Sequence, residues 1–255
     1  MSREKMENIK NKILVMSGKG GVGKTTISVN LAHALAKKGY SVGLLDVDIH
    51  GPNVPKMLNL GDSKISVHDN RLIPVERHKG LKVISMAFLM QENKATIWRG
   101  PMKHNIIRQF VDDVDWGKLD YLIVDFPPGT GDEAISVGHL LHNITGVIIV
   151  STPQEVAILD AVRAIDFAES IKVPLLGLVE NMVGEMFGRG GLEKVARSKG
   201  MPLLGNCDMD RTIRVAGDEG APYSGLSQKA KESFDSIAER VMERAKSLRR
   251  GAQKE

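Results

Sequence analysis

A glycine-rich segment with two lysines and two threonines lies near the start of the chain, GKGGVGKTT at residues 18–26. It fits the pattern G-x-x-x-x-G-K-[ST], in which backbone N–H groups surround the phosphates of a nucleotide. Lys24 can place its ammonium near the β- and γ-phosphates, and the Thr25 hydroxyl can coordinate Mg²⁺. The pattern predicts a site for ATP and Mg²⁺ formed by Gly18, Lys19, Gly20, Gly21, Val22, Gly23, Lys24, Thr25 and Thr26.

The sequence on either side of this loop predicts the elements that such a site needs. Residues 13–17, ILVMS, are mostly apolar and predict a short buried strand. After the loop, Ile27, Leu31, Ala34 and Leu35 recur at helical spacing. A strand, a glycine loop and a helix in this order direct the positive end of the helix dipole at the phosphates.

Two aspartates, Asp46 and Asp48, end the next apolar run. Side chains at i and i+2 point to the same side while a strand continues. Close to a phosphate loop, such carboxylates can support the Mg²⁺ shell or orient an attacking water. We expect Asp46 to do the first and Asp48 the second. The alternative is a polar strand end at which aspartate starts a turn.

A third aspartate, Asp125, ends the apolar run YLIVD at 121–125. This is the Walker B pattern, in which a buried strand delivers one carboxylate to the Mg²⁺ side of the phosphates. The following PPGTGD, residues 127–132, predicts a stiff loop that responds to the γ-phosphate, or else an ordinary strand-to-helix connection. Asn181 ends a later apolar run, and its amide suits either an adenine edge or a turn.

Apolar runs alternate with segments of helical periodicity along the whole chain. The runs lie at residues 13–17, 42–46, 83–88, 121–125, 147–151, 175–180 and 202–205. Alternation of this kind predicts an α/β fold with a mostly parallel, twisted sheet of about seven to eight strands and helices on both faces. Together with the glycine loop at 18–26, it indicates a P-loop NTPase. Ligands then bind at the carboxyl ends of the strands.

The domain prediction is a single P-loop domain over residues 1–255. It begins with a polar tail at residues 1–11, and residues 62–80 are expected to be a solvated hairpin. Residues 98–111 predict a helical segment opened by WRGPM. An amphipathic helix at about residues 229–250 is expected to dock on its own domain, because its polar face mixes both charges; a membrane-binding helix is the alternative.

Composition limits the partners and the location. The 255 residues include 35 Lys and Arg against 31 Asp and Glu, with only 4% aromatics, so the sequence argues against nucleic acid as a partner. The single cysteine, Cys207, excludes an intrachain disulfide and an all-cysteine metal site within one chain. The chain has no run of 18 apolar residues and no apolar signal core at its N-terminus, so we expect no transmembrane segment and a cytoplasmic location.

Lys19 points to a particular class, because an ordinary phosphate loop needs no lysine directly after its first glycine. KGGVGKT at 19–25 resembles the deviant Walker A loop of the MinD/ParA class. Longer segments are similar to the Mrp/ApbC group of that class, iron–sulfur cluster carrier ATPases. They are GKGGVGKTT at 18–26, LDVDIHGPNVPKML at 45–58, WRGPM at 98–102, DYLIVDFPPGTGD at 120–132, ENM at 180–182, PLLG at 202–205 and IRVAGDEGAP at 213–222.

The resemblance implies a homodimer that hydrolyses ATP slowly, with apo-protein clients or iron–sulfur assembly proteins as partners. Lys19 would reach the nucleotide of the other subunit and act with Lys24 and Asp48 in catalysis. Asn181 would contact adenine, and Asp210 would border the same base. The alternative function is a MinD/ParA-like positioning or regulatory ATPase that acts through protein, membrane or DNA partners.

The sequence differs from the Mrp/ApbC group at the cysteine motif that binds the iron–sulfur cluster. That group usually carries a CPxC-type pair after its Glu-Asn-Met. Here Met182 is followed by VGEMFGR at 183–189, which contains no cysteine. Because thiolates are the normal ligands of iron–sulfur clusters, the usual cluster site is expected to be absent. Cys207 is expected to be a small buried side chain rather than a replacement ligand.

Overall fold

The structure, a computed structural model, describes residues 6–49, 51–78, 80–88, 108, 110 and 112–252. Its strands are β1 (Ile9–Met16), β2 (Val42–Asp46), β3 (Ser66–His68), β4 (Arg71–Ile73), β5 (Val75–His78), β6 (Leu81–Ser85), β7 (Leu119–Asp125), β8 (Gly146–Ser151), β9 (Leu175–Val183) and β10 (Leu203–Asp208). Its helices are α1 (Lys24–Lys37), α2 (Val54–Met57), α5 (Asp132–Leu140), α6 (Glu155–Ser170), α7 (Gly191–Ser198), α8 (Arg211–Asp218) and α9 (Gln228–Ala252).

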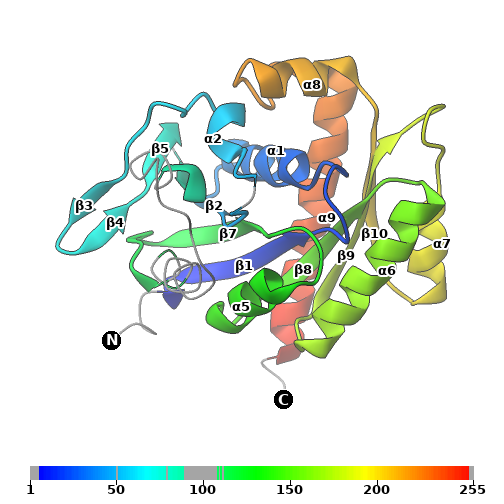
Figure 1. The fold of residues 1–255 in the computed structure, drawn as a ribbon, viewed down its shortest axis with the longest axis horizontal. Coiled ribbons are helices and arrows are strands. Elements are labelled where there is room, and N and C mark those ends of the chain that lie inside the picture. The colour runs from blue at the N-terminus through cyan, green and yellow to red at the C-terminus, as the bar shows by residue number, and fades with distance from the viewer. Residues whose placement is uncertain are drawn as a thin grey trace.

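Eight of these strands form one sheet in the order β10-β9-β8-β1-β7-β2-β6-β5 (Figure 1). Every neighbouring pair is parallel except β5 and β6, which are antiparallel. Strands β3 and β4 form a separate antiparallel hairpin. The prediction of an α/β fold with a mostly parallel sheet is confirmed. Since β1 lies between β8 and β7, the phosphate loop that follows β1 emerges near the middle of the carboxyl edge.

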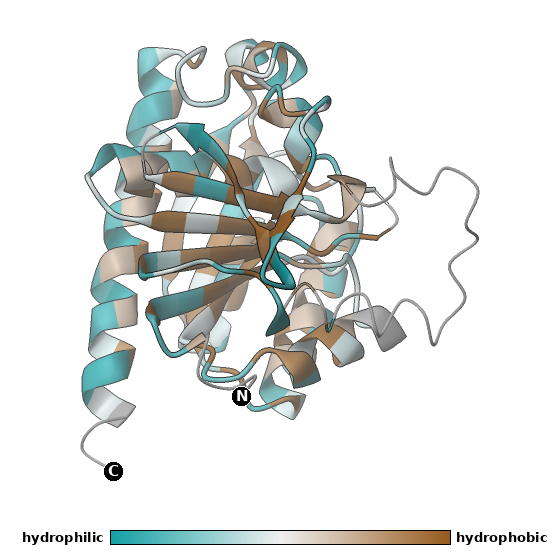
Figure 2. Ribbon diagram, turned by 90° about the vertical axis from the view of Figure 1, so that its left-hand side faces the viewer, coloured by the Kyte–Doolittle hydropathy of each residue, from teal (hydrophilic) through white to brown (hydrophobic). Residues whose placement is uncertain are grey.

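Helices cover both faces of the sheet, and each face has its own hydrophobic cluster. The cluster on one face includes Leu31 of α1 and Phe234 of α9, and the cluster on the other includes Val137 of α5 and Ile165 of α6. In Figure 2 the mostly hydrophobic strands lie between α9 on one side and the second helical layer on the other. Strands covered on both faces are buried nearly throughout, which is why they read as continuous apolar runs.

Strand β1 begins at Ile9, four residues before the predicted start at Ile13. The predicted polar tail at 1–11 is therefore shorter, since the strand already includes part of it. The polar side chains there have backbone acceptors: Asn11 Nδ2 donates to the Asp120 carbonyl at 2.9 Å, and Lys12 Nζ donates to the His142 carbonyl at 2.9 Å. Buried polar groups are stable when they are hydrogen-bonded in this way, so charge alone does not exclude a strand.

Two further expectations differ from the structure. Strand β6 covers Leu81–Ser85 instead of residues 83–88. The region at 62–80 contains the expected hairpin, β3–β4, but also β5, which joins the main sheet. The helical segment predicted at residues 98–111 lies outside the described residues except for residues 108 and 110, which are helical.

The long C-terminal helix packs on its own domain. In α9 the side chains of Phe234, Ile237, Val241 and Ala245 are buried in the same cluster as α1. The helix contacts both α1 and β10. The prediction of a docked amphipathic helix is confirmed, and its apolar stripe is occupied by the protein itself.

Candidate nucleotide site

The phosphate loop between β1 and α1 is held in place by close backbone approaches. A Cβ on Gly18 would lie 1.9 Å from the carbonyl oxygen of Asp160 in α6, so only glycine fits there. Gly23 has φ of 85°, and a Cβ on it would lie 2.1 Å from Nδ2 of Asn181. The loop after β7 joins it, since Gly129 N donates to the Ser17 carbonyl at 2.9 Å. Two glycines of the predicted motif are thus required by packing as well as by phosphate binding.

Asp125 is the centre of a buried polar cluster beneath this loop. Its Oδ1 accepts from Lys24 Nζ at 2.8 Å and from Ser28 Oγ at 2.7 Å, and its Oδ2 accepts from Thr25 Oγ1 at 2.7 Å. Lys24 is 6% exposed, and its ammonium also lies 3.7 Å from Asp48 Oδ2. The structure therefore brings together four residues that the sequence assigned to one site, from three separate strand ends.

The oxygen donors in this cluster suit Mg²⁺. The Thr25 hydroxyl and the Asp125 carboxylate are hard oxygen ligands 2.7 Å apart. Mg²⁺ keeps several waters and takes few protein ligands, so this pair together with phosphate oxygens fits its preference. Among the described residues, no group of three or more His, Cys, Asp or Glu side chains could hold a metal without such help.

Asp46 lies behind the pocket and is fully buried. Its Oδ2 accepts from Ser85 Oγ at 2.8 Å, and its Oδ1 accepts from Asp48 N at 3.2 Å. Burial, and then the charge of Asp125, raise the pKa of Asp46 to about 8. Burial therefore favours the protonated carboxyl, and a nearby cation would lower its pKa. Asp46 thus connects the cluster to the loop that carries Asp48.

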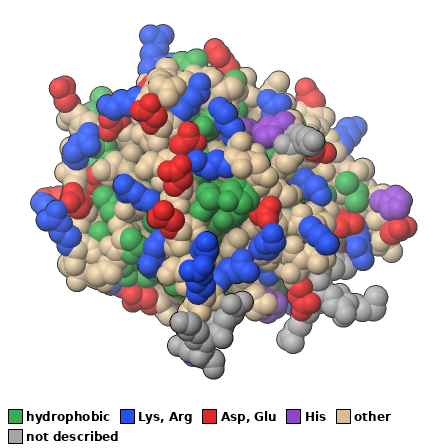
Figure 3. Space-filling view, turned by 180° about the vertical axis from the view of Figure 1, so that it is seen from behind, with side chains coloured by type: hydrophobic (Ala, Val, Ile, Leu, Met, Phe, Trp, Pro, Cys, Tyr) green, Lys and Arg blue, Asp and Glu red, His purple; other side chains and the backbone are tan. Residues whose placement is uncertain are grey.

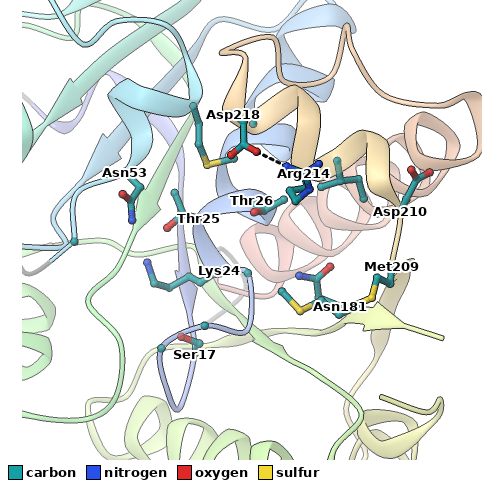
Figure 4. Close-up of a pocket in the computed structure, with 18 of the residues that line it drawn as sticks. Ser17, Lys24, Thr25, Thr26, Asn53, Asn181, Met209, Asp210, Arg214 and Asp218 are labelled. Carbon is teal, nitrogen blue, oxygen red and sulfur yellow. Dashed lines mark hydrogen bonds and ion pairs between the residues drawn. The ribbon is translucent and has the colours of Figure 1, made fainter. Parts of the chain in front are cut away.

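A pocket of about 1010 Å³ opens above the phosphate loop (Figure 4). Figure 4 shows Lys24 and Thr25 at one end of it and Asn181, Met209 and Asp210 at the other. Predicted site residues that line it are Gly20, Gly21, Gly23, Lys24, Thr25, Thr26, Asp48, Asn181 and Asp210. Its volume and the glycine loop at one end suit a nucleotide, with the phosphates over the glycines.

The end of the pocket away from the phosphate loop is built from β9 and the start of α8. Asn181 Nδ2 donates to the Val22 carbonyl at 2.9 Å, which ties β9 to the loop. Asp210 caps α8, and its Oδ1 accepts from Thr212 N at 2.7 Å. Hydrogen bonds from Ser227 and then Thr212 hold the pKa of Asp210 below its usual value. Adenine recognition by Asn181 and Asp210 remains a prediction.

Five predicted site residues do not line the pocket: Gly18, Lys19, Val22, Asp46 and Asp125. Val22 belongs to the core cluster that contains α1. The side chain of Lys19 is half-buried and makes no ion pair with any described residue. Its cross-subunit role therefore remains a prediction that depends on a second copy of the chain.

Sequence reasoning missed several residues of this site. Ser28 follows Lys24 by four residues, so helical spacing could have placed it on the same face. Ser85 reaches Asp46 because β6 pairs with β2, a register that the sequence does not specify. Helices α2 and α8 contact each other, and Lys56, Met57, Arg211 and Arg214 line the pocket from them. The family resemblance at 45–58 and 213–222 covers much of these two helices, but it assigned no role in the pocket to these four side chains.

The β9 hairpin, residues 183–189, is closed where the resembled group carries cysteines. Gly184 N donates to the Gly188 carbonyl at 3.0 Å, and Gly188 N donates back to Gly184 at 2.7 Å. Met186 between them is 76% exposed. Cys207 is fully buried in β10, and burial raises the pKa of its thiol to about 12. The expected small buried cysteine is confirmed, and a neutral thiol is a poor metal ligand.

Comparisons with known proteins agree with this geometry. A family described as "ParA: NUBPL iron-transfer P-loop NTPase" matches residues 8–242. The chain belongs to this family. The "Iron-sulfur cluster carrier protein" of Methanocaldococcus jannaschii is 44% identical over 253 residues, which cover 95% of this chain and 87% of that protein. The protein of the same name from Methanococcus maripaludis is 44% identical over 255 residues, covering 96% of this chain and 88% of the relative.

Solved structures of related proteins have folds that match this chain. The nucleotide-binding protein from Archaeoglobus fulgidus, in complex with ADP, matches with a TM-score of 0.78 and 36% identity over 91% of this chain and 95% of that one. The cell division ATPase MinD of Pyrococcus furiosus matches with a TM-score of 0.73 and 24% identity over 92% and 99%, and it shows the fold alone. The chain is a nucleotide-binding P-loop NTPase of the iron–sulfur carrier family with a MinD-like fold. Among the described residues, no helix is long and apolar enough to cross a membrane.

Proposed function

We propose that this family member binds Mg²⁺-ATP in the pocket above the phosphate loop, hydrolyses it slowly and uses it to switch a homodimer. The observation that carries the proposal is the buried cluster of Lys24, Thr25 and Asp125, with Asp48 at 3.7 Å from the same ammonium. These groups supply a phosphate-binding cation, two metal ligands and a carboxylate for water. The nucleotide-bound relative from Archaeoglobus fulgidus supports the ligand class.

The hydrolytic step needs an oriented water and charge neutralisation. Water attacks the γ-phosphorus, the bond from that phosphorus to the β-bridging oxygen breaks, and ADP and phosphate leave with the proton of the water. Asp48 orients the water, and Lys24 stabilises charge on the phosphate oxygens. Mg²⁺, held by Thr25 and Asp125 with Asp46 supporting its shell, would neutralise the β- and γ-phosphates. Lys24 leaves Asp125 when the phosphates arrive, which frees that carboxylate.

The loops at residues 48–53 and 126–132 are the parts that respond to ATP. Asp48 Oδ1 accepts from Gly51 N at 3.2 Å, and Gly129 N contacts the Ser17 carbonyl. Both loops therefore touch groups that the phosphates would move, which is the requirement for a γ-phosphate switch. Lys19 would act from one subunit on the nucleotide of the other.

The proposed role of this chain in iron–sulfur cluster transfer differs from that of the relatives that are named as cluster carriers. We propose that this chain does not hold a bridging cluster through its β9 hairpin, because that hairpin contains no cysteine and is closed by two backbone hydrogen bonds. The ATP switch would then act on apo-protein clients or iron–sulfur assembly proteins. Because the apolar side of α9 packs against the domain, no observation supports the alternative of a membrane-binding helix.

The first test is ATP turnover by Lys24→Ala. Loss of the phosphate-binding ammonium is expected to reduce turnover by at least about a hundredfold. Lys194→Ala, an exposed lysine on α7, is the matched control and is expected to keep full turnover. Unchanged turnover in Lys24→Ala would refute the assignment of the site.

The second test concerns the subunit contact. Lys19→Ala is expected to keep the fold and nucleotide binding but to weaken the ATP-dependent dimer, as measured by light scattering with and without ATP. Because Lys19 makes no ion pair with a described residue, its removal is not expected to destabilise the monomer. Normal dimerisation and turnover in this variant would refute the cross-subunit role.

The third test is anaerobic reconstitution with iron and sulfide, read as cluster absorbance and iron per dimer. The wild type and Cys207→Ser are both expected to lack a stoichiometric cluster. A cluster that forms in the wild type and is lost in Cys207→Ser would show that Cys207 replaces the missing pair. A cluster that forms in both would place its ligands elsewhere and would also overturn the proposal.

A further inference from the structure

A second pocket, of about 500 Å³, lies at the opposite end of the sheet from the nucleotide pocket. It is formed by the amino ends of β1 and β7 and by the last turns of α9. Tyr40, Tyr121 and Met242 contribute its apolar part, and Lys246, Arg249 and Arg250 contribute cations. Pockets of this volume hold small molecules, and nothing in the nucleotide mechanism uses this one.

Two tyrosines that pack against each other form one wall of this pocket. Their rings form an edge-to-face pair with centroids 5.2 Å apart and an interplanar angle of 84°. Tyr121 is only 6% exposed. Among the residues that the structure describes, neither tyrosine hydroxyl has a hydrogen-bond partner, and both hydroxyl oxygens are accessible from the pocket. The pocket therefore contains hydroxyl donors that remain available to a ligand.

Apart from the Lys10–Asp120 ion pair, the side chains that line the pocket carry a net positive charge. Lys10 Nζ lies 2.7 Å from Asp120 Oδ1, and the second oxygen of Asp120 accepts from Ser41 N at 3.0 Å, so this pair is satisfied. Three cations of α9 form no ion pair with any described residue, and Glu243 is the one acidic side chain in the lining besides Asp120. The three cations are Lys246, Arg249 and Arg250.

Helix stability accounts for only part of this arrangement. Arginines in the last turn stabilise the dipole of α9. That effect does not require two unpartnered tyrosine hydroxyls in the same pocket. The charge of Arg249 also acts on the Tyr121 hydroxyl, where it opposes the rise in pKa that burial causes. Arginine and tyrosine thus face a common space.

We propose that this pocket binds a small oxyanion, a molecule that carries carboxylate or phosphate groups. The guanidinium groups of Arg249 and Arg250 would bind the anion, the hydroxyls of Tyr40 and Tyr121 would donate to it, and Met242 would contact its carbon atoms. Figure 3 looks onto the face that carries α9 and shows a small hydrophobic area near its middle, surrounded by several Lys and Arg and by fewer Asp and Glu side chains. The ligand would bind far from the phosphate loop and independently of ATP.

The test uses the small number of tyrosines. The chain has three, and the third, Tyr223, donates to Asp235 at 2.8 Å outside this pocket. Ring-¹³C-tyrosine protein saturated with ADP is titrated with citrate and, separately, with pyrophosphate, while the tyrosine signals are followed by NMR. ADP fills the phosphate loop, so pyrophosphate cannot report on that loop. The signals of Tyr40 and Tyr121 are expected to shift and saturate, and the signal of Tyr223 is expected to stay.

Two variants locate the binding. The double variant Arg249→Gln with Arg250→Gln is expected to weaken binding by about tenfold or more, because hydrogen bonds to charged groups are lost. Lys194→Gln removes one exposed charge from α7 and is expected to bind as the wild type does. Both changes are at exposed positions, so the fold is expected to be retained.

Each outcome decides the proposal. Saturation by citrate alone assigns a carboxylate ligand, saturation by pyrophosphate alone assigns a phosphate ligand, and saturation by both supports the shared chemistry. No saturable shift at millimolar concentrations would overturn the proposal. Equal shifts in all three tyrosines, or equal binding by the double arginine variant, would also overturn it. A response to an oligoglutamate peptide but to neither small anion would assign the surface to a protein partner and refute a small-molecule site.

Discussion

The phosphate loop and the β9 hairpin both follow buried parallel strands, yet they are constrained very differently. The phosphate loop is fixed by α6 against Gly18, by Asn181 against Gly23 and by the buried Asp125 cluster beneath it. The hairpin at 183–189 is closed mainly by the hydrogen bonds between Gly184 and Gly188 and carries an exposed Met186. The constraints that hold the nucleotide site are therefore separable from the segment at which the Mrp/ApbC group usually carries its cluster.

Removal of the acceptor beneath the phosphate loop is expected to have the largest effect on stability. Asp125→Ala leaves the buried Lys24 ammonium without its 2.8 Å partner, and breaking a buried pair is expected to reduce the free energy of unfolding by about 3–5 kcal/mol. Chemical denaturation of the nucleotide-free protein measures this change. The control is Asp166→Ala, which breaks a surface pair with Lys199 and is expected to change stability by less than about 1 kcal/mol. Equal effects in the two variants would contradict the buried cluster.

A second test compares one glycine from each region. A Cβ at Gly18 would overlap the backbone of α6, so Gly18→Ala is expected to reduce the free energy of unfolding by about 3 kcal/mol. Gly188 in the hairpin has φ of 84°, and no heavy atom lies within 4 Å of the position that a Cβ would take there. Gly188→Ala is therefore expected to lose only about 1 kcal/mol, from backbone strain. Denaturant midpoints of both variants decide this, and a larger loss for Gly188→Ala would reverse the comparison.

The pH dependence of stability tests the buried cluster through the pKa of Asp46. The pKa of Asp46 is about 8 in the folded protein and near 3.8 in an unfolded chain, so the folded state holds a proton that the unfolded state releases. This contribution to stability is full below the unfolded pKa and is lost as pH rises through the folded pKa. Asp46→Asn cannot ionise, so its stability is expected to decline less between about pH 4 and pH 8, the interval between the unfolded and the folded pKa.

Unfolding midpoints at several pH values, without nucleotide, test the Asp46 prediction. Asp166→Asn, at an exposed carboxylate, is the control and is expected to keep the wild-type decline. Parallel pH curves for the wild type and Asp46→Asn would show that Asp46 does not hold the proton. Saturating Mg²⁺-ADP is expected to reduce the difference between the two proteins, since a nearby cation lowers the pKa of Asp46.

The sequence predicts the phosphate end of the site well, because its parts are local. The glycine loop, Lys24 and Thr25 are adjacent, and Asp48 and Asp125 lie just after or at the end of apolar strands whose carboxyl ends meet the same edge. The other end of the pocket depends on α2 and α8, which contact each other across more than a hundred residues. Helix–helix packing of this kind leaves no local periodicity, and the family resemblance at 45–58 and 213–222 gave no contact between the two segments, so these lining residues were not predicted.

The fold shows the same division between local and long-range information. The order of strands and helices follows from apolar periodicity, which acts over a few residues. The early start of β1 does not follow from periodicity. Its polar residues Asn11 and Lys12 are stabilised by the carbonyl groups of Asp120 and His142, which lie more than a hundred positions away. The antiparallel edge strand β5 was likewise missed, since Val75–His78 is only half-buried and reads as polar.

The smallest expected effect concerns the ion pair at the base of the hairpin. Arg189 lies 3.0 Å from Asp208 and is 61% exposed, so solvent screens the pair. Arg189→Ala is expected to change the free energy of unfolding by less than about 1 kcal/mol and to leave ATP turnover unchanged. Lys229 remains paired with Asp208 at 2.6 Å, which keeps that carboxylate neutralised. If Arg189→Ala lowered turnover as strongly as a change in the phosphate loop, the hairpin and the nucleotide site would be coupled, and their separation would be wrong.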